Sequence, residues 1–117
     1  MNNLIIIEKY ETFVNYVYPI LQNVERRHGV VKLRTIELIF NQTDLFYKAI
    51  KTNQKSKLYE ADANMASIRF HLRFLTDLHR FKGNQTKNKG FSKKQHTHAS
   101  ILLSEVGAIL NSWISKK

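Results

Sequence analysis

The sequence predicts an all-α protein, an up-down-up-down four-helix bundle made from a single domain of 117 residues. Three observations favour this fold class. Apolar residues recur at spacings of three and four along four separate stretches, which is the period of an amphipathic helix. The connections between most of these stretches are short, as between antiparallel neighbours. No stretch alternates apolar and polar residues as a strand would. The predicted helices cover about residues 5–28, 31–52, 56–81 and 93–115, and a flexible basic loop spans 82–92.

The first predicted helix contains the only proline of the chain, Pro19. Proline removes one backbone hydrogen bond and clashes with the carbonyl four residues earlier. The helix therefore either kinks near Asn15 or ends at Tyr18, and the apolar positions on both sides of the proline favour one kinked helix. Cations near residue 28 suit a helix C-terminus, and Gly29 suits the left-handed cap that follows one.

The second and fourth predicted helices each carry one apolar stripe. In the second helix the stripe consists of Leu33, Ile36, Phe40, Thr43, Tyr47 and Ile50, widened by Ile39, Phe46 and Ala49. The fourth helix begins at a capping box, in which Ser92 precedes Gln95 by three residues. Its Gly107 permits the close approach of a neighbouring element.

The third predicted helix, within residues 58–81, contains no glycine or proline and has two apolar faces. The first face is Leu58, Ala61, Met65, Ile68, Leu72 and Leu75. The second face is Tyr59, Ala66, Phe70, Phe74 and Phe81. A ridge of Arg69, Arg73 and Arg80 lies between them. A helix on the outside of a bundle needs only one apolar stripe, so the second face needs a partner, either another helix or another subunit.

Charge is the strongest compositional signal. Nineteen Lys and Arg residues stand against nine Asp and Glu residues, which gives a formal net charge of +10. Such a charge on a small domain indicates a polyanionic partner, nucleic acid first and an anionic membrane surface second. No segment separates a lipid-facing stripe from a Lys-rich face, and no apolar run approaches the ~20 residues of a membrane span. We therefore expect no membrane partner and a cytoplasmic protein.

The sequence offers no catalytic constellation. The chain lacks cysteine, and it contains no glycine-rich phosphate loop, no serine-nucleophile signature and no Glu-x-x-His pair. His96 and His98 are too close in sequence to share one helical face, and they are expected to be solvated polar residues. We expect a protein that is not an enzyme, with no cofactor and no metal.

Binding is the remaining function. Arg69 and Arg73 share a helical face and are flanked by Phe70 and Phe74, a combination that can contact phosphates and stack on bases. Alternatively, the phenylalanines belong to the core and the arginines pair with Asp62 or Asp77. Arg26 and Arg27 either complement a helix dipole or reach a phosphate. The candidate nucleic-acid-binding residues are Arg26, Arg27, Lys57, Arg69, Arg73 and Arg80.

Several stretches, in order and over nearly the whole chain, resemble a known family. They are residues 8–11 (EKYE), 18–19 (YP), 27–29 (RHG), 56–63 (SKLYEADA), 72–75 (LRFL) and 105–114 (EVGAILNSWI). Together they are similar to the accessory variability determinant (Avd) proteins of diversity-generating retroelements. Lys57 and Arg73 lie within the matched stretches, whereas the Lys-rich segment 82–94 does not.

The resemblance implies a four-helix bundle that assembles as a barrel-shaped homopentamer with a basic surface. It also implies a partnership with the reverse transcriptase of the retroelement and binding of RNA and DNA with little sequence preference. Such proteins are needed for mutagenic retrohoming, in which adenines of a template RNA are miscopied. Two alternatives stay open: a four-helix bundle protein of the ribosomal-RNA intervening-sequence type, and a structural scaffold oligomer without nucleic-acid function.

Overall fold

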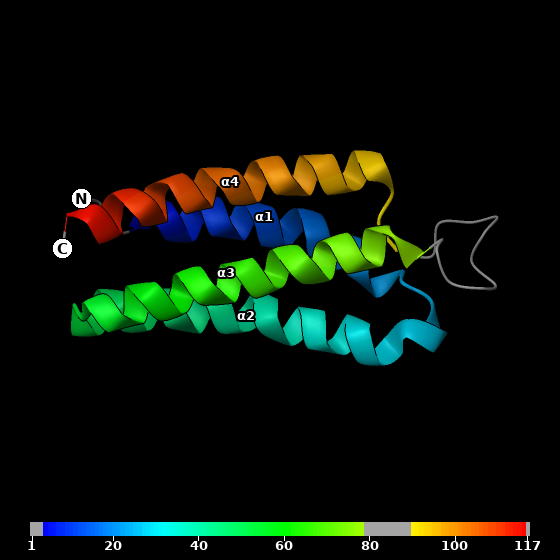
Figure 1. Ribbon diagram of the computed structural model, residues 1–117, viewed down its shortest axis with the longest axis horizontal. Coiled ribbons are helices and arrows are strands. Elements are labelled where there is room, and N and C mark those ends of the chain that lie inside the picture. Colours follow the sequence, from blue (N-terminus) through cyan, green and yellow to red (C-terminus); the bar gives the residue numbers. More distant parts are fainter. Residues whose placement is uncertain (1–3, 79–89, 117) are drawn as a thin grey trace.

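The computed structural model describes residues 4–78 and 90–116. They form α1 (Leu4–Gln22), the short 3-10 helix η1 (Arg26–His28), α2 (Gly29–Thr52), α3 (Lys55–Thr76) and α4 (Lys93–Ser115). Successive α-helices run in opposite directions along one bundle, and α1 begins at the end of the bundle where α4 finishes (Figure 1). The predicted all-α four-helix bundle is confirmed, and the described residues contain no strand.

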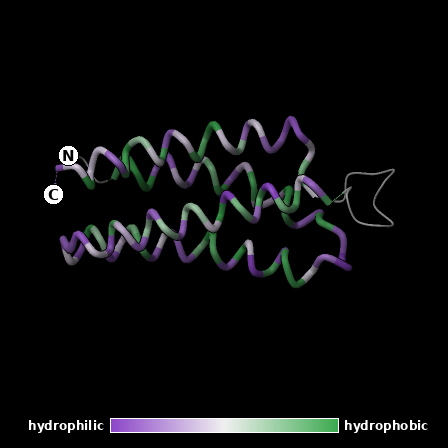
Figure 2. The backbone as a smooth tube through the Cα atoms, viewed as in Figure 1, coloured by the Kyte–Doolittle hydropathy of each residue, from purple (hydrophilic) through white to green (hydrophobic). Residues whose placement is uncertain are grey.

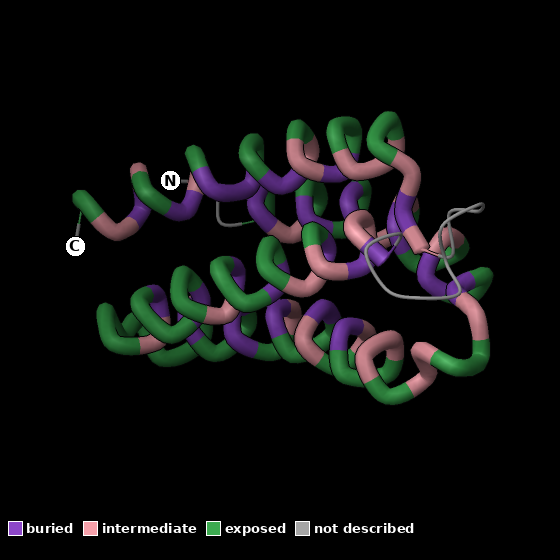
Figure 3. Tube along the Cα trace, turned by 45° about the vertical axis from the view of Figure 1, so that its right-hand side comes forward, coloured by how far each residue is buried: buried purple, intermediate pink, exposed green. Residues whose placement is uncertain are grey.

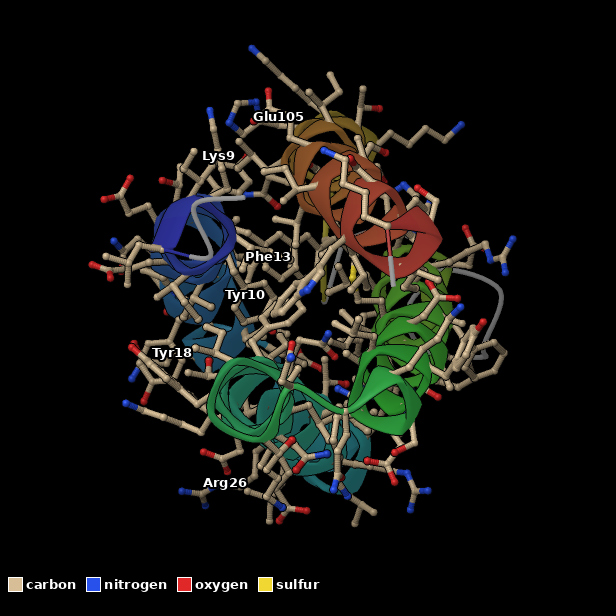
Figure 4. All side chains as sticks on the ribbon, turned by 90° about the vertical axis from the view of Figure 1, so that its left-hand side faces the viewer. Lys9, Tyr10, Phe13, Tyr18, Arg26 and Glu105 are labelled. Atoms are coloured by element: carbon tan, nitrogen blue, oxygen red, sulfur yellow. The ribbon has the colours of Figure 1, made fainter. Side chains whose placement is uncertain are left out.

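The four helices pack in a square. Each of α1 and α3 contacts both α2 and α4, whereas the diagonal pairs do not touch within the described part of the chain. Apolar stretches line the inner sides of the helices (Figure 2), and the buried positions lie on the same inner sides (Figure 3). Tyr10 and Phe13 of α1 point into the space between the helices (Figure 4). This arrangement places the outer surfaces of α3 and α4 next to each other.

The predicted core face of the third helix is confirmed in full. All six of its members, from Leu58 to Leu75, are at most 2% exposed. The helix begins at Lys55 and ends at Thr76, and the connection from α2 is only Asn53–Gln54. Asn53 adopts the left-handed conformation (φ 55°, ψ 30°) and caps α2 through a hydrogen bond from its N–H to the carbonyl of Ala49. Such a short turn holds α2 and α3 antiparallel.

The apolar stripe predicted for the second helix is correct only in part. The residues that widen it, Ile39, Phe46 and Ala49, are buried, but its main line is rotated away from the core. Leu33, Phe40 and Tyr47 are 58%, 45% and 44% exposed. The buried stripe of α2 consists instead of Thr35, Ile39, Gln42, Leu45, Phe46 and Ala49. Hydropathy hid this stripe because two of its members are polar and satisfied by hydrogen bonds.

These two buried polar residues bond to backbone carbonyls. Thr35 donates its hydroxyl to the carbonyl of Val31 at 2.7 Å, and Gln42 donates its side-chain N–H to the carbonyl of Ala61 at 2.9 Å. Asn64 of α3 donates to both the carbonyl of Leu38, at 2.9 Å, and the Oε1 atom of Gln42, at 2.6 Å. The hydrogen bonds of Gln42 and Asn64 join α2 to α3 and so fix the rotation of α2 against α3.

The first helix continues through Pro19 as one element, which decides between the two sequence alternatives. It ends at Gln22, however, and not near residue 28, because bonds of the i to i+3 type from Asn23 and Val24 close its last turn. The left-handed cap predicted at Gly29 is wrong. Gly29 has right-handed helical angles (φ −59°, ψ −35°) and is the first residue of α2.

The entry into α4 is ordered by specific contacts, so the loop predicted for residues 82–92 ends earlier than expected. Phe91 is fully buried, and its N–H donates to the carbonyl of Leu75 at 3.3 Å. The capping box is confirmed: the Ser92 hydroxyl accepts from the N–H of Gln95, and the Gln95 side chain accepts from the N–H of Ser92, both at 3.0 Å. Residues 82–89 of the predicted loop lie outside the described residues, as do Arg80 and Phe81.

None of the described helices is long and apolar enough to cross a membrane.

Candidate nucleic-acid interface

Arg69 and Arg73 lie one turn apart on α3, on the side that faces α4. They border a pocket of about 310 Å³ between the two helices, here called the α3–α4 pocket. Its lining consists of Arg69, Leu72 and Arg73 from α3, and of His96, Ser100, Leu103 and Ser104 from α4. Leu72 and Leu103 are almost completely buried. The pocket therefore has an apolar floor and a rim of cations and hydroxyl groups.

None of the described residues that line the α3–α4 pocket carries a carboxylate. The ion pairs among the described residues are Lys9–Glu105, Arg27–Glu25 and Lys57–Glu60, and none of them involves Arg69 or Arg73. The predicted alternative, in which these two arginines pair with Asp62 or Asp77, is therefore not what the described residues show. Two guanidinium groups next to an acid-free pocket create a positive potential that favours an anionic ligand.

The Arg69 side chain reaches across to the neighbouring helix. A β-carbon built on Gly107 of α4 would lie 3.0 Å from the Nη2 atom of Arg69. The close approach that the sequence predicted at Gly107 is thus the approach of a guanidinium group. Because glycine has no side chain, the guanidinium of Arg69 can approach the backbone of α4 at this position.

Sequence reasoning missed the contribution of α4 to this site. It placed His96 among solvated polar residues, yet His96 is half-buried and lines the α3–α4 pocket. His96, Ser100 and Ser104 are spaced four residues apart, so they follow one another along a single helical face. That spacing was visible in the sequence, but only the packing of α4 against α3 shows what the face meets.

His98 has a different environment. Its ring packs edge-on against Tyr16 of α1, with the ring centroids 4.4 Å apart. Among the described residues, no group of three or more His, Asp or Glu side chains is arranged to hold a metal ion.

Of the other predicted cations, those that the structure describes do not join Arg69 and Arg73 in one patch. The Nε atom of Arg27 lies 2.7 Å from a carboxylate oxygen of Glu25, and Lys57 lies 3.3 Å from Glu60. Lys57 is also ~24 Å from Arg73 along α3, at 1.5 Å of rise per residue. Arg26, on η1, is exposed and extends away from the bundle (Figure 4). Arg80 lies outside the described residues.

The second apolar face of α3 is largely open to solvent. Phe70 and Tyr59 are 54% and 53% exposed, and Phe74 is half-buried with its ring centroid 6.2 Å from that of Phe70. The alternative in which both phenylalanines belong to the core is therefore wrong for Phe70. Lys55 lies over the Tyr59 ring, 5.8 Å from its centroid. This face borders the arginine ridge.

A second exposed apolar surface lies on the α1–α2 side of the bundle. Tyr18 points outward from α1 (Figure 4), and its ring meets that of Phe40 with centroids 5.7 Å apart. A groove of about 450 Å³, here called the α1–α2 groove, runs beside Phe40 and Tyr47 and includes Glu11 and Asp44. Helix α3 lies diagonally across the bundle from α1. The chain therefore exposes two different apolar surfaces on separate sides.

Comparison with known proteins gives one match. A protein-family model described as bAvd-like matches residues 4–117. No curated protein matches the chain.

Proposed function

Because the chain belongs to the bAvd-like family, we propose that it is a non-catalytic, nucleic-acid-binding partner of a reverse transcriptase. In this proposal it acts in the mutagenic retrohoming of a diversity-generating retroelement, where it binds RNA and DNA with little sequence preference. The family match over nearly the whole chain supports the retroelement context. The charge and the α3–α4 pocket support the binding activity.

The observation that carries the binding proposal is the state of Arg69 and Arg73. On a chain of net charge +10, these two guanidinium groups border a pocket without a carboxylate and form no ion pair with the described residues. Phosphate contacts by such groups release counterions, so affinity depends on salt and only weakly on sequence. This is the behaviour expected of a general nucleic-acid-binding accessory protein.

The direct test is the double variant Arg69→Gln/Arg73→Gln. We expect it to bind single-stranded RNA and DNA more weakly, and to show a smaller dependence of affinity on salt. For single strands, each phosphate that is no longer neutralised reduces the slope of log K against log salt by about 0.7. The matched control is Lys48→Gln/Lys51→Gln, which removes the same charge from exposed positions of α2.

An equal effect of both double variants would show that only the total charge matters. If the wild-type protein does not bind nucleic acid at moderate salt, the binding proposal fails, and a scaffold that engages an acidic protein becomes the better account.

The proposal includes assembly into a homopentamer. Its support is the pair of exposed apolar surfaces, the Tyr59–Phe70 face of α3 and the α1–α2 groove, which lie on separate sides of the bundle. Contact between two different surfaces of one subunit is head to tail, and head-to-tail contacts form a ring when the rotation between subunits closes. The subunit number of five rests on the family resemblance, not on the geometry.

The partnership with a reverse transcriptase has its own test. A tagged form of this chain, co-expressed with the reverse transcriptase of its retroelement, should retain the enzyme after purification and nuclease treatment. Loss of the enzyme on nuclease treatment would mean that nucleic acid merely bridges the two proteins, which contradicts a direct partnership. The Arg69→Gln/Arg73→Gln variant should retain the enzyme if docking uses another surface.

A further inference from the structure

We propose that the α3–α4 pocket binds one phosphate group of a nucleic-acid strand and that α4 supplies three of its five polar ligands. Arg69 and Arg73 approach from α3, and His96, Ser100 and Ser104 approach from α4. The inference rests on the proposed nucleic-acid binding and deepens it. It replaces a diffuse basic surface with a defined binding site that includes three residues outside the basic ridge.

The donor set suits a phosphate group, whose oxygens are arranged tetrahedrally and not in one plane. Each arginine presents a planar fork of N–H donors, and each serine hydroxyl and the imidazole ring can donate one more hydrogen bond. A carboxylate has two oxygens in one plane and is satisfied by a single bidentate arginine. Two forks on one helix and a row of donors on the next surround a tetrahedral group better than a planar one. The chemistry therefore favours phosphate over an acidic side chain.

The pocket has space for such a group. Its volume of about 310 Å³ corresponds to roughly ten water molecules at about 30 Å³ each. A phosphate group together with the edge of its sugar fits this space. The floor of the pocket belongs to the core, because Leu72 and Leu103 are only 2% and 1% exposed.

The environment reinforces the selectivity for an anion. The His96 end of the pocket lies in the first turn of α4, where the helix dipole is positive, and that turn has no acidic residue. Lys93 and Lys94 occupy that first turn and are exposed. Neither the helix dipole nor the two lysines would define a site alone, but both favour an anion beside the hydrogen-bond donors of the pocket.

The test is a carboxylate placed inside the pocket. Ser104→Glu puts a negative charge next to Arg69 and Arg73, at a position exposed enough to accept it without unfolding the helix. The matched control is Asn111→Glu, which adds the same charge to the same helix. Asn111 is exposed, lies two turns further along nearly the same side of α4, and does not line the pocket. Both variants have a net charge lower by one.

Binding is measured by fluorescence anisotropy with a labelled oligothymidylate of about 12 nucleotides, within the usual range of site sizes. We expect Ser104→Glu to weaken binding at least about tenfold more than Asn111→Glu, and to reduce the salt slope by about 0.7 for each phosphate that the variant no longer binds. Circular dichroism melting checks that both variants are folded. Equal weakening by the two variants overturns the phosphate site.

A charge-neutral variant gives a second measurement. Arg69→Lys/Arg73→Lys preserves the net charge but replaces both forks with point charges. If the pocket holds a phosphate through the forks, affinity falls although the charge is unchanged. Full retention of affinity overturns the site, because it would show that only electrostatic attraction operates.

The source of the phosphate is decided by the end of the strand. If Ser104→Glu weakens the binding of an oligonucleotide with a 5′-hydroxyl, the pocket binds an internal phosphodiester. If it weakens only the binding of an oligonucleotide with a 5′-phosphate, the pocket binds the terminal group. Either result supports the site. Failure of this inference also differs from failure of the proposed function: in the first case the wild-type protein binds the strand and the two glutamate variants are equal, and in the second the wild-type protein does not bind.

Discussion

The guanidinium group of Arg69 lies so close to Gly107 that a β-carbon at that glycine would stand 3.0 Å from its Nη2 atom. The contact joins α3 to α4 at the edge of the α3–α4 pocket. The atom in the way is the far end of a flexible side chain, so a methyl group there would displace the guanidinium without moving the backbone. The glycine thus sets where one of the candidate phosphate ligands lies.

Gly107→Ala is therefore expected to change stability and binding in opposite directions. Alanine is a better helix former than glycine by up to about 1 kcal/mol, and the other nearby atom, Cε of Met65, would lie at an ordinary 3.7 Å. Urea unfolding should show equal or higher stability, while affinity for single-stranded nucleic acid falls. In an Arg69→Ala background the same substitution should leave affinity unchanged, and a persistent loss there would contradict the role of the contact.

Tyr10→Phe tests a buried hydrogen bond between α1 and α2. The Tyr10 hydroxyl donates to the carbonyl of Ile39 within the core, so its removal should cost about 0.5–1.5 kcal/mol of unfolding free energy. The ring remains, and its packing against Phe13 and Phe46 is preserved. Denaturant unfolding at neutral pH measures the loss, and an unchanged unfolding free energy would show that the hydrogen bond contributes nothing.

The same residue predicts a dependence of stability on alkaline pH. Burial raises the pKa of Tyr10 above its ordinary value of 10.0, because the charged phenolate is poorly solvated in the core. The folded state therefore keeps its proton when the unfolded state loses it. The contribution of Tyr10 to the free energy of unfolding is fully present below about pH 10, and it falls by up to ~1.4 kcal/mol per pH unit above that pH. Between pH 9 and 11, the free energy of unfolding should decline less steeply with pH in Tyr10→Phe than in the wild-type protein.

Gly90→Ala should be strongly destabilising. A β-carbon at Gly90 would lie 2.2 Å from the carbonyl oxygen of Leu75, so the backbone that leads into α4 must move. Loss of the adjacent bond from Phe91 to the same carbonyl is expected, with a total cost of about 1–3 kcal/mol. Gly29→Ala is the matched control, because Gly29 is right-handed and has nothing within 4 Å of its β-position. Thermal unfolding of both variants should show a lower midpoint for Gly90→Ala alone.

Phe70→Glu should dissociate the proposed oligomer. Phe70 is 54% exposed on the second face of α3, and a carboxylate buried in an apolar subunit contact is costly. The control is Ile101→Glu on α4, where the isoleucine has the same exposed fraction. Light scattering should give a smaller particle for Phe70→Glu and an unchanged one for Ile101→Glu. A wild-type protein that is monomeric at micromolar concentration would contradict the oligomer itself.

The structure separates what periodicity can reveal from what it cannot. The core face from Leu58 to Leu75 was predictable because it is continuous and apolar. The corresponding face of α2 was predictable only in part. Ile39, Phe46 and Ala49 belonged to the predicted stripe, but Thr35 and Gln42 complete the buried face, and the larger apolar residues Leu33, Phe40 and Tyr47 lie outside it. Hydropathy measures the cost of transferring a side chain from water, not whether a buried polar group finds a hydrogen-bond partner. Here Thr35 and Gln42 find their partners in the backbone carbonyls of Val31 and Ala61.

The candidate site shows the same division. Arg69 and Arg73 were predictable as a pair from their spacing on one helix. That Arg27 and Lys57 pair with neighbouring acids, and that His96, Ser100 and Ser104 complete a pocket with the arginines, depended on distances that the spacing does not contain.

The sequence by itself determined the four helices, the capping box at Ser92, the core face of α3, the excess of positive charge and the family. Each of these follows from local spacing, from composition, or from short matching stretches in a fixed order. Only the tertiary structure decided how α2 is rotated, that Gly29 begins a helix, and that α4 forms a pocket together with Arg69 and Arg73. These features depend on which faces meet across the bundle, and contacts between distant residues and hydrogen bonds of buried groups fix that choice.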